Sequence, residues 1–203
     1  MPLITFAGIC AVLWRGRARW VASAPLVLGL ALWAATTRPI LLISSDGALV
    51  GLMGAQGRAL SVARGAGYTA DNWLQDDGDL VVQAEAYARA GFLGPKGARA
   101  FEVDGWRGVA LSGKAAVGAV LAACARADLV VMPSAVAPVV PKPKDCVVID
   151  RTMLDRTGAL ALSVRDGRLI LQPTRAAQRI WMAEKPVWQD LSFAKPGALL
   201  ARQ

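Results

Sequence analysis

The sequence contains no histidine among its 203 residues. Hydrolytic zinc sites are usually built around histidine ligands, and serine or cysteine nucleophiles usually need a histidine base. The chain therefore excludes the ordinary forms of zinc hydrolase and of serine or cysteine hydrolase. It also lacks the GxxxxGK[ST] phosphate-binding pattern, so the pair Gly113–Lys114 indicates only the start of a helix.

Acidic residues are also scarce, with 15 Asp and Glu against 23 Lys and Arg and a net charge of +8. Beyond Arg38 the balance is 19 basic to 15 acidic residues, or +4. A nucleic-acid-binding surface and an ordinary solvated surface both produce such an excess. The candidate DNA contacts are Lys142 and Lys144, in a proline-rich loop, and Arg165 and Arg168, near the end of the domain.

Hydrophobic residues, in contrast, make up 55% of the chain, which suggests a membrane part attached to an ordinary domain. Two uncharged runs, Met1–Trp14 and Trp20–Thr37, flank a short arginine-rich loop. The second run has 18 residues, just enough for a helix to cross the hydrocarbon core. We therefore expect residues 1–38 to be a membrane segment with one or two transmembrane helices. A cleaved signal peptide is the alternative interpretation.

The loop between these runs predicts the orientation of the chain. It carries Arg15, Arg17 and Arg19, and short loops rich in arginine stay in the cytoplasm. The second helix would then leave the cytoplasm, so everything after Arg38 is expected to face the outside.

The pattern beyond Arg38 predicts a mixed α/β domain over residues 39–172, followed by a tail over 173–203. Short apolar runs separated by glycine-containing turns predict a meander over 40–63, and hairpins through Asp-Gly pairs are expected at 104–105 and 166–167. A helix over 112–127 between two strands indicates a mixed sheet covered by helices. Thr69 and Asp150 are the expected N-caps of two short helices.

Two of the three cysteines are candidates for a disulfide. Cys124 ends the expected helix and Cys146 opens the strand after the proline-rich loop. In an oxidising compartment they would close a loop of about 20 residues, which stabilises the fold by about 3 kcal/mol on the chain-entropy model. Two buried free thiols are the alternative.

Carboxylates are the remaining candidates for chemistry, because Mg²⁺ sites need only oxygen ligands. The run DDGD supplies Asp76, Asp77 and Asp79, while Asp46, Asp128 and Asp150 are scattered. The run lacks the ligand spacing of a calcium loop, so a solvated turn after a helix is the favoured interpretation.

Several sequence segments resemble those of a known family and occur in the same order along the chain: LLISSDGALVGLMGAQGRALS, GAGYTADNWLQDDGD, GVALSGKAA, ACARADLVVMPSAV and DCVVIDRTMLDRTGALAL. From about Trp20 to Leu171 the chain resembles the carboxyl-terminal part of ComEC, the inner-membrane DNA-uptake channel of natural competence, in its alphaproteobacterial form. The resemblance implies a metallo-β-lactamase-like outer domain on the periplasmic side of the bacterial inner membrane. It implies membrane lipid, single- or double-stranded DNA and other competence proteins as partners.

This chain departs from the metal-bearing members of that family. The HxHxDH signature is absent, and the strand at 129–132 is followed by Pro133 and Ser134 where such members place histidines. No catalytic or metal-binding residue is therefore carried over, and no cofactor is expected. The expectation is a degenerate metallo-β-lactamase fold that guides DNA or has a structural role, without catalysis.

Two alternatives to this function remain open. One is a nuclease that uses carboxylates and Mg²⁺, with Asp76, Asp77 or Asp128 as ligands. The other is a truncated, non-functional product, because the pore-forming helices of the family are missing.

Overall fold

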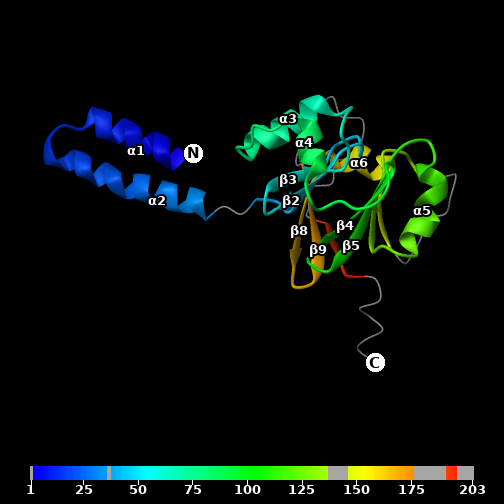
Figure 1. Cartoon of the computed structure of the whole chain (residues 1–203). Helices are drawn as coiled ribbons and strands as arrows, with labels where there is room; N and C mark the ends of the chain where they lie inside the picture. Colours follow the sequence, from blue (N-terminus) through cyan, green and yellow to red (C-terminus); the bar gives the residue numbers. More distant parts are fainter. Residues whose placement is uncertain (1, 36–37, 137–145, 176–190, 196–203) are drawn as a thin grey trace. The chain divides into compact units, whose positions relative to one another are not determined.

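The computed structural model describes residues 2–35, 38–136, 146–175 and 191–195, without the side chains of 17–19 (Figure 1). The chain divides into two compact units, Met1–Arg38 and Pro39–Gln203. The division falls at the boundary that the sequence predicts between the apolar segment and the domain.

The first unit is a helical hairpin of two short helices. Helix α1 (Pro2–Leu13) and helix α2 (Ser23–Ala34) are joined by the 3₁₀ helix η1 (Gly16–Ala22). The two helices approach closely at Gly29, where a Cβ atom would lie 2.9 Å from Cγ1 of Ile4. Each α-helix has 12 residues, or about 18 Å at 1.5 Å per residue.

The expected transmembrane helix over Trp20–Thr37 is therefore wrong as one continuous α-helix. Among the residues that the structure describes, no helix combines the length and apolar character needed to cross a membrane. The physical reason is Pro25, which has no amide hydrogen to donate and whose ring clashes with the carbonyl four residues earlier. The α-helical geometry begins only at Ser23, and the residues before it form the 3₁₀ helix.

The second unit contains two β-sheets, which confirms the mixed α/β class. The larger sheet is antiparallel, with strand order β10-β9-β8-β1-β2-β3. The smaller has the order β4-β5-β6-β7, with β4–β5 antiparallel and the other two pairs parallel. The strands are β1 (Leu41–Ile43), β2 (Val50–Gly54), β3 (Gly57–Leu60), β4 (Ala98–Val103), β5 (Trp106–Leu111), β6 (Leu129–Val131), β7 (Val147–Ile149), β8 (Leu160–Arg165), β9 (Arg168–Pro173) and β10 (Leu191–Phe193).

The main core lies between the two sheets. Alternate residues of β1, β8 and β9 meet alternate residues of β4, β5 and β6 in one buried apolar cluster, which includes Ile43, Leu162, Trp106 and Val131. Successive side chains of a strand point to opposite faces, so each sheet still has an outer face to cover. Helices provide this cover.

One helix covers part of the outer face of the smaller sheet. Helix α5 (Ala116–Cys124) packs Val120 and Ala123 against Leu111, Val130 and neighbouring residues. On the larger sheet, helices α3 (Gly67–Asp76) and α4 (Gln83–Ala88) pack against Leu49 and Leu60 beside strand β3. A fourth helix, α6 (Arg151–Thr157), follows β7 directly. The second unit is thus a pair of facing sheets with helices on both outer sides (Figure 1).

Local sequence signals place most of the turns. Asp104 and Gly105 join β4 to β5 with φ of 44° and 79°, and Asp166 and Gly167 join β8 to β9 with φ of 52° and 71°. Positive φ at both central residues is the geometry of the predicted Asp-Gly hairpin turns. Asp150 caps α6 as expected, since its side chain accepts a hydrogen bond from the amide of Met153.

Three expectations about the domain need correction. Helix α5 is shorter than the predicted 112–127, because Gly113 has a φ of 84° and cannot be helical. Helix α3 begins before Thr69, and its N-cap is Ala66, without a side-chain hydrogen bond. Residues 173–203 are not only a tail, because Leu191–Phe193 pair with β9 as the edge strand β10.

The turn between β1 and β2 packs tightly on the smaller sheet. Gly47 has a φ of 71°, and a Cβ atom there would lie 2.7 Å from the carbonyl oxygen of Met132, at the end of β6. Only glycine satisfies both demands, because it tolerates positive φ and leaves room for the carbonyl. This contact joins the two sheets at one end.

We expect Gly47→Ala to lower the free energy of unfolding by about 2–4 kcal/mol, from left-handed strain plus overpacking. The matched control is Gly167→Ala, which has the same φ of 71° and open space around its Cβ position, and should lower it by about 1 kcal/mol. Urea titration of each variant measures the difference. Equal losses would show that the contact with Met132 contributes nothing.

Candidate functional site

The carboxyl end of strand β6 is the candidate site. The parallel strands β6 and β7 end side by side, so the residues after them, Pro133–Ser134 and Asp150, meet at one edge of the smaller sheet. Ligands often bind outside the carboxyl ends of parallel strands. The backbone amide of Arg151 donates to the carbonyl of Ser134 at 3.5 Å, which connects the two strand ends.

Asp150 is the buried centre of this edge. It has no exposed surface, and its Oδ1 accepts a hydrogen bond from the amide of Met153 at 3.0 Å while Oδ2 accepts one from the amide of Val136 at 3.3 Å. One carboxylate therefore caps helix α6 and also holds the segment that follows β6. Both oxygens have donors, as a buried carboxylate requires.

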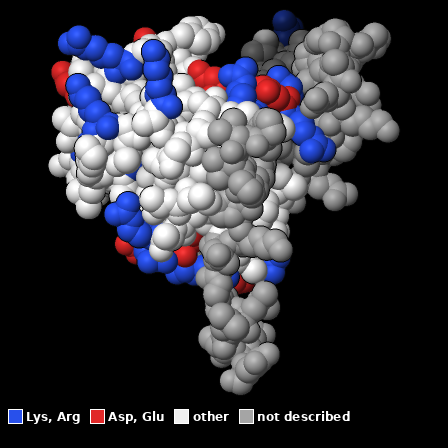
Figure 2. Space-filling view, turned by 90° about the vertical axis from the view of Figure 1, so that its right-hand side faces the viewer, with Lys and Arg blue, Asp and Glu red and all other residues white. Residues whose placement is uncertain are grey.

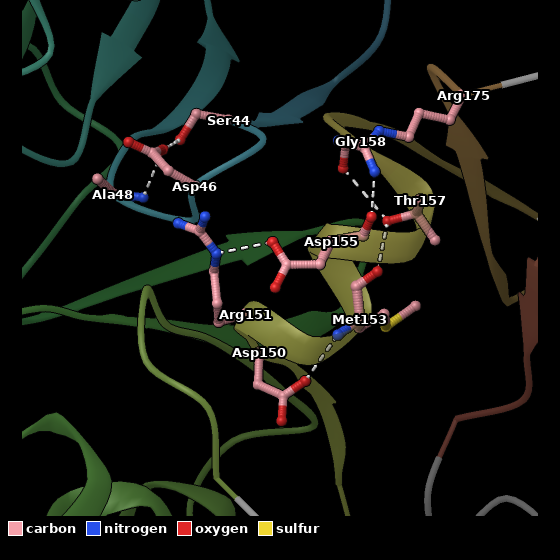
Figure 3. Close-up of polar contacts among 10 residues, drawn as sticks. All are labelled: Ser44, Asp46, Ala48, Asp150, Arg151, Met153, Asp155, Thr157, Gly158 and Arg175. Carbon is pink, nitrogen blue, oxygen red and sulfur yellow. Dashed lines mark hydrogen bonds and ion pairs between the residues drawn. The ribbon is translucent and has the colours of Figure 1, made fainter. Parts of the chain in front are cut away.

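A second polar group lies on the β1–β2 turn (Figure 3). The Ser44 hydroxyl donates to Oδ1 of Asp46, which also accepts the amide of Ala48 at 3.0 Å. Ser44 in turn accepts the amide of Leu49 at 2.9 Å. Partial burial acts to raise the pKa of Asp46, but the bonds from Ser44 and Ala48, helped by the positive charge of Arg151, hold this pKa below its ordinary value. Asp46 is thus an ionised residue of the turn.

Helix α6 contributes charged groups to the same end. Nε of Arg151 donates to Oδ1 of Asp155 at 2.8 Å, one turn along the helix. In Figure 3 the guanidinium of Arg151 lies between Asp155 and the turn that carries Asp46. Arg175, which follows β9, donates to the carbonyl oxygen of Asp155. The bond from Arg175 joins α6 to the segment that follows β9 of the larger sheet.

The chemistry available at this edge is limited. The Ser44 hydroxyl donates to a carboxylate and accepts an amide, so it is held in the turn rather than presented as a nucleophile. Asp150 is committed to two backbone amides. Within the described part of the chain, no three His, Cys, Asp or Glu side chains gather as they would around a metal ion. The described residues of this edge form a hydrogen-bonded junction.

The DDGD run and Asp128, considered as sources of Mg²⁺ ligands, lie away from this edge. Asp77, at the end of α3, pairs with Nε of Arg58 at 2.6 Å, and the Arg58 side chain is 1% exposed. Asp79 pairs with Arg89. Asp128 precedes β6, at the opposite end of that strand, and Asp76 is exposed on α3. A buried charge must be neutralised by a partner, and these arginines provide that neutralisation.

Asp128 and Arg107 form an ion pair at the amino-terminal end of β6. Oδ2 of Asp128 accepts the backbone amide of Arg107 at 3.0 Å, and the guanidinium donates to both carboxylate oxygens at 3.2 and 3.3 Å. Burial acts to raise the pKa of Asp128, but the hydrogen bonds and charge of Arg107, with Lys195 3.9 Å away, hold it below the ordinary value. The same pairing raises the pKa of Arg107.

The cysteine pair lies on the far side of the smaller sheet. Cys124, at the end of α5, and Cys146, before β7, form a disulfide with their Cα atoms 5.4 Å apart and a sequence separation of 22. Both residues are buried in the apolar cluster beneath α5. This is the pairing that the sequence analysis favours over two free thiols.

The candidate DNA contacts are placed only in part. Arg165 and Arg168 face each other across the β8–β9 turn and are exposed, with Nε of Arg168 donating to the Ser192 hydroxyl at 2.8 Å. Lys142 and Lys144 lie outside the described residues, as do the side chains of Arg17 and Arg19, while Arg15 is exposed.

Sequence reasoning missed Lys195 and Arg107, which stand at the same end of the domain as the β8–β9 turn. The ammonium of Lys195, two residues beyond β10, donates to the carbonyl of Gly105 at 2.5 Å. Strand β10 pairs Phe193 with Leu169, next to Arg168. The signal available in the sequence was only the excess of basic residues, which does not say where they meet.

Comparison with models of protein families, with curated proteins and with solved structures found no match.

We expect Asp150→Asn to lower the free energy of unfolding by about 1–3 kcal/mol, because an amide has only one acceptor oxygen and leaves one buried backbone amide without its partner. Asp155→Asn on the same helix, whose carboxylate is 53% exposed, should change it by no more than about 0.5 kcal/mol. Urea unfolding followed by circular dichroism measures both. A loss at Asp155 as large as that at Asp150 would contradict the assignment.

The lowered pKa of Asp128 predicts a dependence of stability on pH. Its folded-state pKa lies below the ordinary 3.8, so its contribution is fully present above that value and is lost as the pH falls through the folded pKa. Asp128→Asn should therefore lower stability at neutral pH and flatten its decline on acidification from about pH 5 to about pH 2. Thermal unfolding across this range, with Asp71→Asn on the exposed face of α3 as control, tests the prediction. A variant whose acid sensitivity matches that of the parent chain would overturn it.

Proposed function

We propose that this chain is part of a ComEC-type DNA-uptake protein whose larger unit guides incoming DNA or braces the channel without catalysis. The observation that carries this proposal is the edge of the sheet after β6. At the place where metal-bearing relatives would present histidines, the backbone of Ser134 and the carboxylate of Asp150 are bound to amides of the same domain. Such an edge suits a structural domain better than a hydrolytic one.

The architecture of the larger unit supports a degenerate metallo-β-lactamase fold. Two facing sheets with helices on both outer sides are compatible with that fold, and the core between the sheets is continuous and apolar. The resemblance in sequence runs through the same segments that form the sheets. The proposed fold family therefore rests both on the order of the similar sequence segments and on the layered architecture.

The first unit supports association with lipid. Its helices expose apolar side chains on all sides, among them Phe6, Val12, Val27 and Trp33, and the first 38 residues contain no acidic residue. A helix that is apolar all round belongs in a core or in a membrane. We propose that the hairpin sits in the bacterial inner membrane with the arginine-rich loop on the cytoplasmic side.

The disulfide supports a periplasmic location for the larger unit. Disulfides persist in oxidising compartments and are rare in the cytosol. Cys124 and Cys146 are joined across the end of α5 and the start of β7. The arginine-rich loop and the disulfide are therefore two independent arguments for a periplasmic location of the larger unit.

The charge of the larger unit supports DNA as the partner. Its excess of basic residues is +4 over residues 39–203. Arg165 and Arg168 are exposed partners at a hairpin tip, and guanidinium groups are common donors to the phosphates of DNA. Figure 2 shows Lys and Arg side chains at several separate places on one face. The proposed contact is therefore with phosphates and independent of base sequence.

The carboxylate nuclease is the weaker alternative, because Asp77 and Asp128 are each paired with an arginine. A divalent ion would have to displace those arginines to bind there.

Binding of a short DNA duplex by the full chain in detergent, measured across a range of salt concentrations, tests the proposal. We expect affinity to fall as salt rises, and the double variant Arg165→Ala, Arg168→Ala to reduce the slope of log affinity against log salt by about 2, because two phosphate contacts are lost. The control removes the same charge from two exposed residues elsewhere, Arg64→Ala and Arg156→Ala, and should leave the slope nearly unchanged. Binding that is insensitive to salt, or equal in both double variants, would overturn the proposed contact.

A further inference from the structure

A large apolar cavity opens on the outer side of the smaller sheet, between α5 and the edge strand β4. Its volume is about 910 Å³, which is within the range for pockets that hold one small molecule. Helix α5 packs over β5 and β6, while Ala100 and Glu102 on the outer face of β4 remain exposed. The floor is formed by Ala98, Ala100 and Val109, and one wall by Ala119 and Ala122 of α5.

The walls are made of small residues for a structural reason. Alternate residues of β4 and β5 point toward the inter-sheet core, and large side chains such as Phe101, Val103 and Trp106 fill it. The residues between them point outward, and on β4 these include two alanines. Together with the alanines of α5 they leave a volume that no side chain of the lining fills.

The cavity has one charged end. Its three ionisable lining residues are Glu102, Arg107 and Arg126. Glu102 and Arg107 are partners across the β4–β5 ladder, and Arg126 lies two residues before Asp128, which binds Arg107. With Lys195 3.9 Å from Asp128, this end holds three cationic groups and two carboxylates.

The opposite end is apolar. Ala98 and Leu111 are partners at the other end of the same ladder, and Leu93 and Pro95 close the cavity there. Leu93 forms a pair of backbone hydrogen bonds with Ala100, which fixes this loop against β4. The cavity is thus a trough along the strands, apolar at one end and weakly cationic at the other.

We propose that this cavity binds a single-chain amphiphile with an anionic head, such as a free fatty acid. The apolar body would lie along β4 and β5 against the alanines of α5, and the head would lie beside Arg126. The guanidinium of Arg126 is suited to this role because Arg126 lines the cavity and is exposed. Its Nε donates to the carbonyl of Ala122 at 3.3 Å, and its terminal nitrogens make no hydrogen bond to the residues that the structure describes. Arg107 is paired with Asp128, yet its side chain remains 63% exposed at the cavity. The argument for this cavity does not rest on the proposed DNA contact.

Photo-crosslinking of the full chain in detergent tests the site. The probe is dodecanoic acid with a diazirine near its methyl end, and mass spectrometry locates the attachment. We expect labelling of peptides within 93–111 and 119–127, near the apolar end of the cavity. Labelling confined to the apolar hairpin 1–38 would show nonspecific partition and would overturn the proposal, as would labelling of neither region.

Two substitutions on helix α5 test whether labelling depends on the cavity itself. Ala122→Trp places an indole in the cavity and should reduce labelling at the site about ten-fold, because the apolar body loses its place. Leu121→Trp is the matched control, since Leu121 is an exposed residue of α5 that does not line the cavity, and labelling should persist. Far-ultraviolet circular dichroism verifies that both variants fold. Equal labelling of both variants would exclude the cavity as the site.

The head group is tested with unlabelled competitors. Dodecanoic acid should compete better than its methyl ester or dodecylamine, and Arg126→Ala should weaken competition by the acid about three-fold while leaving the ester unchanged. Equal competition by acid and amine would overturn the assignment of an anionic head. A cavity that is occupied instead by a protein segment would show no competition by any of the three.

Discussion

The larger unit depends on a buried carboxylate that holds two loops together. Asp150 has no exposed surface and uses one oxygen to cap α6 and the other to bind the amide of Val136. A buried amide left without its acceptor costs about 1–3 kcal/mol, so the carboxylate constrains two segments at once. The packing of Gly47 against the carbonyl of Met132 brings the larger sheet to the same place. The ends of β1, β6 and β7 are therefore held in one junction.

The junction also shows how the carboxylates at the edge after β6 are used: they accept hydrogen bonds from groups of the same domain. A catalytic carboxylate must be free to exchange a proton or to bind a metal ion. Here Asp150 holds backbone amides, and Asp46 is held ionised by Ser44 and Ala48. Elsewhere Asp77, Asp79 and Asp128 each face an arginine. These five carboxylates satisfy donors of the same unit, and the unit has basic residues in excess.

The sequence predicted what depends on neighbours along the chain. The Asp-Gly turns, the cap at Asp150 and the alternating strands follow from contacts within a few residues, and the structure places them as expected. It did not predict the pairs Arg58–Asp77 and Arg107–Asp128, because their partners are 19 and 21 residues apart and meet only through the sheets. The continuous helix over Trp20–Thr37 was wrong because hydropathy ignores the missing amide of Pro25. Nothing in the sequence predicted the cavity, because alanine is common both in helices and in buried cores and does not indicate an unfilled volume.

The topology of the smaller sheet gives the larger unit two chemically different ends. Strands β5 and β6 are parallel, so α5 must return from the carboxyl end of one to the amino end of the other. The residues between α5 and β6, from Arg126 to Asp128, therefore lie beside Arg107 at the start of β5. Strand β10 brings Lys195 to the same end, and the β8–β9 turn brings Arg165 and Arg168. The junction around Asp150 occupies the opposite end. The cationic groups therefore lie at the end of the unit that contains the return from α5 to β6 and the turns of the two hairpins. The phosphates of DNA and the head of an amphiphile would both approach this end. An amphiphile bound there would add negative charge next to the proposed DNA contact and would weaken it.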